Sequence, residues 1–227
     1  MRDSHDGHGH HDGIESGDGI ESGDGIESGD GLSHYARRAQ AIEALLIEKG
    51  ICTADEVQRA MDNTEARSPA DGARVVAHAW SDPAFKARLL SEPRATLNEL
   101  GYSLPEAGTQ ITVVENTDRV HHLVVCTLCS CYPRNLLGRP PDWYKSFAYR
   151  SRAVIDPRGV MREFGLELDE SVEVRVLDST ADMRYLVLPR RPAGTEQLDE
   201  TALAKLVSRD SMIGVVNPRV PEMVAAD

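Results

Sequence analysis

Three of the four cysteines in this chain of 227 residues fall within one short run, Cys126-Thr127-Leu128-Cys129-Ser130-Cys131. A disulfide scaffold would need an even set of cysteines in an oxidising compartment, whereas the fourth cysteine, Cys52, lies far upstream. A structural zinc site would need a second pair of Cys or His ligands, and none follows at a suitable spacing. A thioredoxin-like pair would use Cys126 and Cys129, leave Cys131 over and need a strand-then-helix setting that is missing here. The spacing therefore favours a transition metal held by thiolates, because soft sulfur ligands suit such metals better than magnesium or calcium.

Two histidines, His121 and His122, precede the cysteine run. They lie on a predicted strand over residues 120–125 that leads straight into it. Adjacent strand residues point to opposite faces of a sheet, so we expect at most one of the two to turn inward. The expected ligand set therefore rests on the cysteine run, called the claw below (residues 126–131).

The stretch VVCTLCSCYP over residues 124–133 resembles the metal-binding signature of the alpha subunit of nitrile hydratase, in the nitrile hydratase and thiocyanate hydrolase superfamily. Further blocks are similar to blocks of that family and follow in the same order: PPDWYKS at 140–146, YRSR at 149–152, RPAGTE at 191–196 and RDSMIG at 209–214. The resemblance covers roughly residues 33–216. It implies an α+β fold, in which an N-terminal helical arm precedes a layered α/β domain that carries the claw.

The resemblance also implies the ligand set. The sulfur atoms of Cys126, Cys129 and Cys131 and the main-chain nitrogens of Ser130 and Cys131 would bind one trivalent metal and leave a sixth position open. Family members carry a sulfinate on the second cysteine and a sulfenate on the third, which are successive steps of thiol oxidation. Thr127 resembles the cobalt branch, because iron members usually have Ser there. We therefore expect Co(III), with Fe(III) as the alternative.

The implied reaction is the hydration of a nitrile to an amide. The metal would act as a Lewis acid on the nitrile nitrogen or lower the pKa of a bound water. The expected catalytic residues are Cys131, Ser130 and Cys129. A sulfenate oxygen on Cys131 could instead be the base or the nucleophile, and the Ser130 hydroxyl either relays a proton or is present only for its small size.

One residue departs from the cobalt pattern, which usually reads Tyr-Pro-Trp after the claw, whereas this chain has Arg134 in place of the Trp. At that position it resembles the gamma subunit of thiocyanate hydrolase. A cation facing the pocket would favour an anionic substrate, whereas a solvated or interface arginine would not affect substrate choice. A thiocyanate hydrolase subunit is therefore the second hypothesis, with Arg134 as a candidate pocket residue. A non-catalytic thiolate metal carrier is the third.

Residues 1–31 are of low complexity and contain the hexad DGIESG three times. Nine acidic residues and one arginine give this segment a formal charge of -8, out of -12 for the chain, so we predict a disordered tail. Its four histidines are either a loose metal-binding tract or a solvated extension. The acidic balance argues against nucleic-acid binding. We also expect no signal peptide and no membrane span, and hence a cytoplasmic protein.

The remaining sequence divides into a helical arm over 32–101, an α+β catalytic domain over 102–216 and a C-terminal tail over 217–227. In the arm, Ile42, Leu45 and Leu46 fall at helical spacing before Gly50, and Thr53 with Glu56 forms a capping-box pattern for a second helix. Apolar stripes this thin indicate packing against another chain. By resemblance that chain is the beta subunit, and a metal-delivery or activator protein would load the metal.

In the catalytic domain we expect strands over 111–114 and 120–125, with the claw at the end of the second strand. Helices are predicted over 141–150, 156–164 and 199–207. Alternating valines from 172 to 176, a turn over 179–182 and apolar residues from 183 to 187 predict a hairpin. The aromatic residues Trp143, Tyr144 and Tyr149 are expected in the core or an interface.

Overall fold

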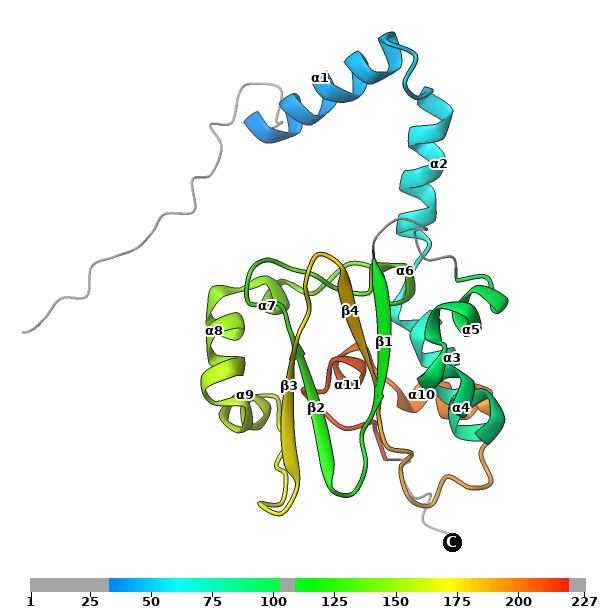
Figure 1. The fold of residues 1–227 in the computed structure, drawn as a ribbon, viewed down its shortest axis with the longest axis vertical. Coiled ribbons are helices and arrows are strands. Elements are labelled where there is room, and N and C mark those ends of the chain that lie inside the picture. The colour runs from blue at the N-terminus through cyan, green and yellow to red at the C-terminus, as the bar shows by residue number, and fades with distance from the viewer. Residues whose placement is uncertain (1–32, 103–108, 221–227) are drawn as a thin grey trace, which may run out of the picture. The chain divides into compact units, whose positions relative to one another are not determined.

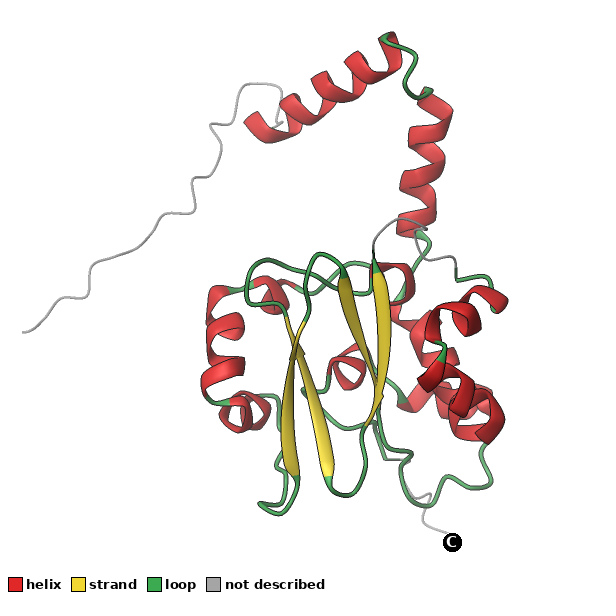
Figure 2. Ribbon diagram, viewed as in Figure 1, coloured by secondary structure: helices red, strands yellow, loops and turns green. Residues whose placement is uncertain are grey.

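A computed structural model describes residues 33–102 and 109–220, so the predicted tail over 1–31 and most of the C-terminal tail lie outside the described residues. The chain divides into two compact units, residues 1–57 and 58–227. Figure 2 shows the mixture of helices and strands in the second unit, which confirms the α+β class. In the described residues, no helix has the length and apolar character needed to cross a membrane.

The first unit contains α1 (His34–Glu48) and the first turn of α2 (Ala54–Glu65). Ser33 caps α1 by accepting a hydrogen bond from the amide of Ala36 at 3.2 Å. None of the residues of α1 is buried, and its apolar residues Ile42 and Leu45 are 56% and 51% exposed. The thin apolar stripe predicted for this helix is therefore present, and its residues are exposed.

The capping box predicted for α2 is confirmed. The amide of Thr53 donates to Oε2 of Glu56 at 2.7 Å, and the amide of Glu56 donates to Oγ1 of Thr53 at 3.2 Å. Two orphan amides at the start of the helix are thereby satisfied by local side chains.

The helices of the second unit after α2 pack around its strands. They are α3 (Pro69–Ser81), α4 (Pro83–Ser91), α5 (Pro93–Glu99), α6 (Arg134–Leu137), α7 (Asp142–Lys145), α8 (Phe147–Ile155), α9 (Pro157–Glu163), α10 (Glu200–Leu206) and α11 (Arg209–Ile213). Proline begins α3, α4, α5 and α9, where its missing N–H costs no helical hydrogen bond. Since α4 and α5 pack on β1 (Gln110–Glu115) and α3 packs on α10, these three helices belong to the claw-bearing unit.

The predicted hairpin over 172–187 is wrong. Both strands form, as β3 (Glu173–Asp178) and β4 (Met183–Leu188), but they do not pair with each other. Instead β3 runs parallel to β2 (Val120–Val125) and β4 runs parallel to β1. Alternation of apolar and polar residues fixes which face of a strand is buried, but it does not fix the partner strand. The turn over 179–182 therefore carries the chain from one strand pair to the other.

The two strand pairs form the centre of the unit. Figure 1 shows α7, α8 and α9 on one flank, beside β2 and β3, and α3, α4, α5 and α10 on the other flank, beside β1. Helix α11 packs against both β2 and β4. Gly214 ends α11 with φ +91°, and a Cβ there would overlap the carbonyl oxygen of His122, so only glycine fits at this contact.

The single helix predicted over 141–150 is divided at Ser146. This residue has an extended conformation with ψ 144°, and its hydroxyl caps α8 by accepting from the amide of Tyr149 at 3.1 Å. The preference of serine for helix caps therefore overrides the continuous helical pattern. The short helices α6 and α11 were not predicted.

The expectation that at most one of His121 and His122 would turn inward is also wrong, because both are buried, at 3% and 8% exposure. The side chain of Asn116 lies between them, with Nδ2 3.1 Å from Nδ1 of His121 and Oδ1 3.1 Å from Nδ1 of His122. Nε2 of His121 also lies 2.7 Å from the carbonyl oxygen of Gly214. Both faces of β2 are covered, so adjacent residues of this strand are buried on opposite faces.

Candidate metal centre

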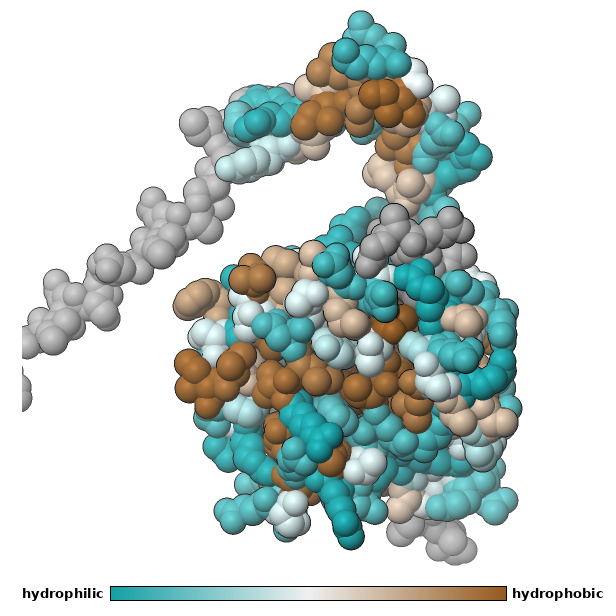
Figure 3. All heavy atoms as spheres, viewed as in Figure 1, coloured by the Kyte–Doolittle hydropathy of each residue, from teal (hydrophilic) through white to brown (hydrophobic). Residues whose placement is uncertain are grey.

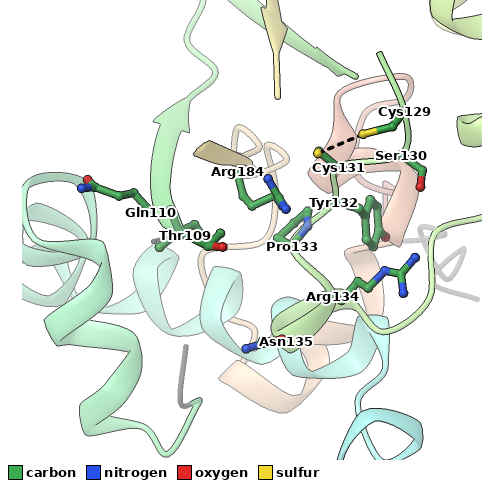
Figure 4. Close-up of a pocket in the computed structure, with 11 residues that line it drawn as sticks. Thr109, Gln110, Cys129, Ser130, Cys131, Tyr132, Pro133, Arg134, Asn135 and Arg184 are labelled. Atoms are coloured by element: carbon green, nitrogen blue, oxygen red, sulfur yellow. Dashed lines mark hydrogen bonds between the residues drawn. The ribbon is translucent and has the colours of Figure 1, made fainter. Parts of the chain in front are cut away.

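The claw begins where β2 ends, because Cys126 directly follows Val125. Sγ of Cys129 lies 3.4 Å from Sγ of Cys126. It lies 3.2 Å from Sγ of Cys131, the contact that Figure 4 shows as a dashed line. The amide of Cys129 also donates to Sγ of Cys126 at 3.3 Å, which closes the turn. All three sulfur atoms lie within 4.8 Å of one another. In the described parts of the chain, His121 and His122 do not join this cluster.

The three thiols differ in exposure and in acidity. Cys126 is fully buried, Cys131 is 8% exposed and Cys129 is exposed. Hydrogen bonding from Cys131, and then from Cys126, lowers the pKa of Cys129, so this thiol loses its proton before Cys131 does. Burial, and then the hydrogen bond with Cys129, raises the pKa of Cys131 to about 12. A metal bound at all three sulfurs must therefore displace the proton of Cys131.

Asp178, the last residue of β3, binds the second residue of the claw, Thr127. Its register partner is Val125, so the carboxylate reaches the residue after Cys126. Oδ1 accepts from the amide of Thr127 at 2.9 Å, and Oδ2 accepts from the hydroxyl of Thr127 at 2.5 Å. On the other side, a guanidinium N–H of Arg150 donates to the carbonyl oxygen of Thr127 at 3.3 Å. Thr127 is thus fixed through three of its polar groups.

Two tyrosine hydroxyls bond to the main chain here, one to the last residue of the claw and one to β2 before the claw. The hydroxyl of Tyr144 donates to the carbonyl oxygen of Cys131 at 2.8 Å, and that of Tyr149 donates to the carbonyl oxygen of Val124 at 2.6 Å. Both are buried, as predicted for core aromatics. Burial raises the pKa of each phenol above its ordinary value, so both remain donors.

A pocket of about 310 Å³ opens against Cys129, Ser130 and Cys131. Its other walls include Thr109, Gln110, Arg134, Asn135 and Arg184 (Figure 4). Arg134 lies at the start of α6 and is exposed, so the structure brings the predicted pocket candidate to the rim of this cavity. Arg184 of β4 is the second cation, and its charge opposes the rise in the pKa of Cys131.

Sequence reasoning missed Arg184 and Asp178 as parts of the site, and it assigned Tyr144 only to the core. Asp178 follows the predicted strand residues 172–176 and ends the observed β3, and a polar residue at the carboxyl end of a strand is a signal that could have found it. For Arg184, which lies inside a strand 53 residues after Cys131 by the chain numbering, no motif is present. Its place depends on the parallel pairing of β4 with β1, which was not predicted.

The donor set suits a soft or borderline transition metal. Three cysteine sulfurs converge without a disulfide, and the main-chain amides of Ser130 and Cys131 form hydrogen bonds to the sulfur of Cys129. Two of the sulfurs are buried against the core, which favours a bound cation over separate thiolates because like charges at this spacing repel. Cys126, Cys129 and Cys131 could therefore hold one metal ion, with one side facing the pocket.

Comparison with known proteins identifies the family. Residues 33–216 match the family model for nitrile hydratase, alpha chain. The alpha subunit of the low-molecular weight cobalt-containing nitrile hydratase of Rhodococcus rhodochrous is 51% identical over 187 residues, which covers 82% of this chain and 90% of the relative. The thiocyanate hydrolase subunit gamma of Thiobacillus thioparus is 39% identical over 189 residues, which covers 79% of this chain and 78% of the relative.

A solved structure of an Fe-type nitrile hydratase from Comamonas testosteroni matches with a TM-score of 0.73 and 45% identity, over 82% of this chain and 90% of that one. The region matched by the family model, residues 33–216, contains the helices and strands from α1 to α11, together with the claw. The family match therefore agrees with two features of the structure, its mixture of helices and strands and its three convergent thiols. The chain belongs to the nitrile hydratase alpha-chain family.

Proposed function

We propose that this chain is the catalytic alpha subunit of a cobalt nitrile hydratase, which adds water to a nitrile to give an amide. The observation that carries the proposal is the convergence of three cysteine sulfurs at one end of a pocket, within a chain that matches the family over residues 33–216. Cobalt is named for the relative at 51% identity. Thr127 supports cobalt over iron, which is named for the Fe-type structure.

The proposed ligands are the sulfur atoms of Cys126, Cys129 and Cys131 and the main-chain nitrogens of Ser130 and Cys131. In the proposed active form, Cys129 carries two added oxygen atoms as a sulfinate, which one dioxygen molecule supplies. Cys131 carries one as a sulfenate; the other oxygen atom of a second dioxygen leaves as water, with two electrons and two protons from an external thiol reductant. The exposure of Cys129 and its lowered pKa support this assignment, because thiolate character and access favour oxidation.

When bound, the metal supplies a Lewis acid beside the pocket. Hydration forms one carbon–oxygen bond, and both protons of the water end on the nitrile nitrogen. Ser130 lies between two of the proposed ligand cysteines and lines the pocket, which supports a role for its hydroxyl in passing a proton between water and nitrogen. The oxygen on Cys131 is the proposed proton acceptor. Asp178 and Arg150 keep the turn fixed during these transfers.

The proposed partner is a beta subunit. Exposed apolar residues on α1, which has no buried residue, support a contact with a second chain. Figure 3 shows apolar surface on α1 and, within the second unit, on the flank formed by α8 and α9. On α8, Phe147 and Ile155 are 78% and 81% exposed. Within the predicted arm over 32–101, we propose α1 and α2 as the part that contacts the partner. We also propose that an activator protein loads the metal and that the complex lies in the reducing cytoplasm, where thiols stay free.

Arg134 at the pocket supports a second candidate function, thiocyanate hydrolysis, since a cation favours an anionic substrate. The test co-produces the chain with its partner in cobalt medium and measures hydration of a neutral nitrile and hydrolysis of thiocyanate. Arg134→Trp is compared with Arg139→Trp, a matched exposed arginine that pairs with Glu65 outside this pocket.

We expect the parent complex to hydrate nitriles, with little thiocyanate turnover, and Arg139→Trp to behave like the parent. Arg134→Trp should improve handling of neutral nitriles. Thiocyanate hydrolysis by the parent that collapses only in Arg134→Trp would establish the second function instead. Reversible metal binding by unmodified thiols, without either activity, would establish the metal carrier.

A further inference from the structure

One end of the claw is held by a side chain from a helix outside it. The hydroxyl of Tyr144 in α7 donates to the carbonyl oxygen of Cys131 at 2.8 Å, and Tyr144 is completely buried. This carbonyl belongs to the last residue of the claw. Its direction is set by the same backbone torsion that sets the path of the chain out of the claw into Tyr132 and Pro133.

The phenol of Tyr144 is itself fixed in place. Its ring packs against Tyr132 with centroids 5.3 Å apart, against Tyr149 at 5.6 Å and against Trp143 at 5.9 Å. A side chain enclosed on three sides by aromatic rings cannot change rotamer without moving its neighbours. The hydroxyl therefore presents a hydrogen-bond donor at a constant position.

The opposite end of the claw is held independently. Cys126 follows β2, and Thr127 is bound by Asp178 and Arg150. Cys131 has no strand to anchor it, because the chain after it enters the loop that leads to α6. Among the described residues outside the claw, Tyr144 provides the side-chain hydrogen bond that is observed to the carbonyl oxygen of Cys131.

We propose that Tyr144 is a positioning residue of the metal centre, whose hydroxyl holds Cys131 so that its sulfur stays beside those of Cys126 and Cys129. The inference rests on the proposed function only in taking Cys131 as a metal ligand. A ligand held in place before the metal arrives loses less conformational entropy on binding, so the affinity for the metal rises. Tyr144 acts through Cys131 and does not touch the substrate.

Two neighbouring tyrosines provide matched controls. The hydroxyl of Tyr132 is buried and has no hydrogen-bond partner among the described residues, so Tyr132→Phe removes an oxygen atom without removing a bond. The hydroxyl of Tyr149 donates to the carbonyl oxygen of Val124 in β2, so Tyr149→Phe removes an equivalent bond outside the claw. Only Tyr144→Phe removes a bond to a claw residue.

The experiment titrates the reduced, metal-free full-length chain and the three variants with Co(II) alone and follows the sulfur-to-cobalt charge-transfer absorption. Thermal unfolding by circular dichroism defines a temperature at which all four proteins are folded, and the titrations are made there. A fifth protein, with 4-aminophenylalanine in place of Tyr144, restores a hydrogen-bond donor and covers the case in which Tyr144→Phe does not fold.

We expect the apparent dissociation constant for Co(II) to rise about 10–100-fold in Tyr144→Phe, as for other residues that orient metal ligands. Tyr132→Phe and Tyr149→Phe should stay within about twofold of the parent, and the aminophenylalanine protein should recover most of the affinity. Equal affinity in Tyr144→Phe and the parent, or an equal loss in all three Phe variants, would overturn the inference. The nitrile assay on the complex decides the proposed function separately, because the titration involves neither the partner nor the substrate.

Discussion

The two ends of β2 both bury polar side chains, but they do so in opposite ways. At its amino end, His121 and His122 share the side chain of Asn116, and His121 also meets the carbonyl oxygen of Gly214. At its carboxyl end, the sulfur atoms of Cys126 and Cys131 have Cys129 as their neighbour, and Cys129 faces a pocket. At the amino end, hydrogen-bond donors are paired with acceptors, whereas at the carboxyl end three groups of the same kind, the thiols, lie together.

This difference separates a structural polar site from a reactive one. A buried group with a complementary partner adds to stability and is chemically quiet, because its hydrogen bonds are already made. Three thiols whose side-chain partners are one another gain more from a cation than from their present contacts. The neighbours that surround a buried polar group therefore predict its role better than its burial does.

The largest effect is expected at the cysteines. Cys126→Ala, Cys129→Ser and Cys131→Ser should each lower metal retention and nitrile hydration at least a hundredfold, since removal of a ligand must exceed the roughly 10–100-fold effect of a residue that only orients one. Metal analysis and the nitrile assay measure this. The control Cys52→Ala lies outside the cluster, and metal loss in that variant would show that the ligand set is misassigned.

Asp178→Asn should have the next largest effect, because it weakens the hold of the carboxylate on Thr127 while keeping the side-chain shape. We expect cobalt content or turnover to fall about tenfold. Asp169→Asn is the matched control, since Asp169 accepts from the amide and hydroxyl of Ser171 in the same way but away from the claw. Equal losses in the two variants would remove Asp178 from the site.

At the other end of β2, Asn116→Ala should lower the free energy of unfolding by about 1–3 kcal/mol, because the amide of His122 loses its acceptor and each histidine ring loses one partner. The metal content of the folded variant should stay the same as in the parent. Chemical denaturation and metal analysis of the same samples test both statements. A variant that keeps its stability but loses cobalt would reverse the roles assigned to the two ends.

The smallest effect concerns pH. Burial lowers the pKa of both His121 and His122, so in the unfolded chain these residues bind protons at a higher pH than in the folded protein. The free energy of unfolding should therefore be greatest above the ordinary histidine pKa of about 6.5 and fall as the pH decreases below it. Denaturation of the metal-free chain between pH 8 and about 5 measures this slope. An unchanged slope in His121→Gln would contradict the assignment to His121.

Much of the site and part of the fold were predictable because they depend on local sequence. The claw, the strand that leads into it and the Thr53–Glu56 capping box all involve neighbouring residues. The supports of the claw come from later elements, so the contacts of Tyr144 and Asp178 depend on tertiary packing. The pairing of β3 with β2 was not predictable either, since an alternating strand fits several partners.

The unequal exposure of the three sulfur atoms gives the claw a direction. An ion that arrives from solvent meets Cys129 first, and it reaches the fully buried sulfur of Cys126 only after that contact. Leu128, the neighbour of Cys129 in the turn, is 84% exposed, so the chain leaves this sulfur accessible. The order in which the three sulfur atoms meet an incoming ion therefore follows from which of them faces outward.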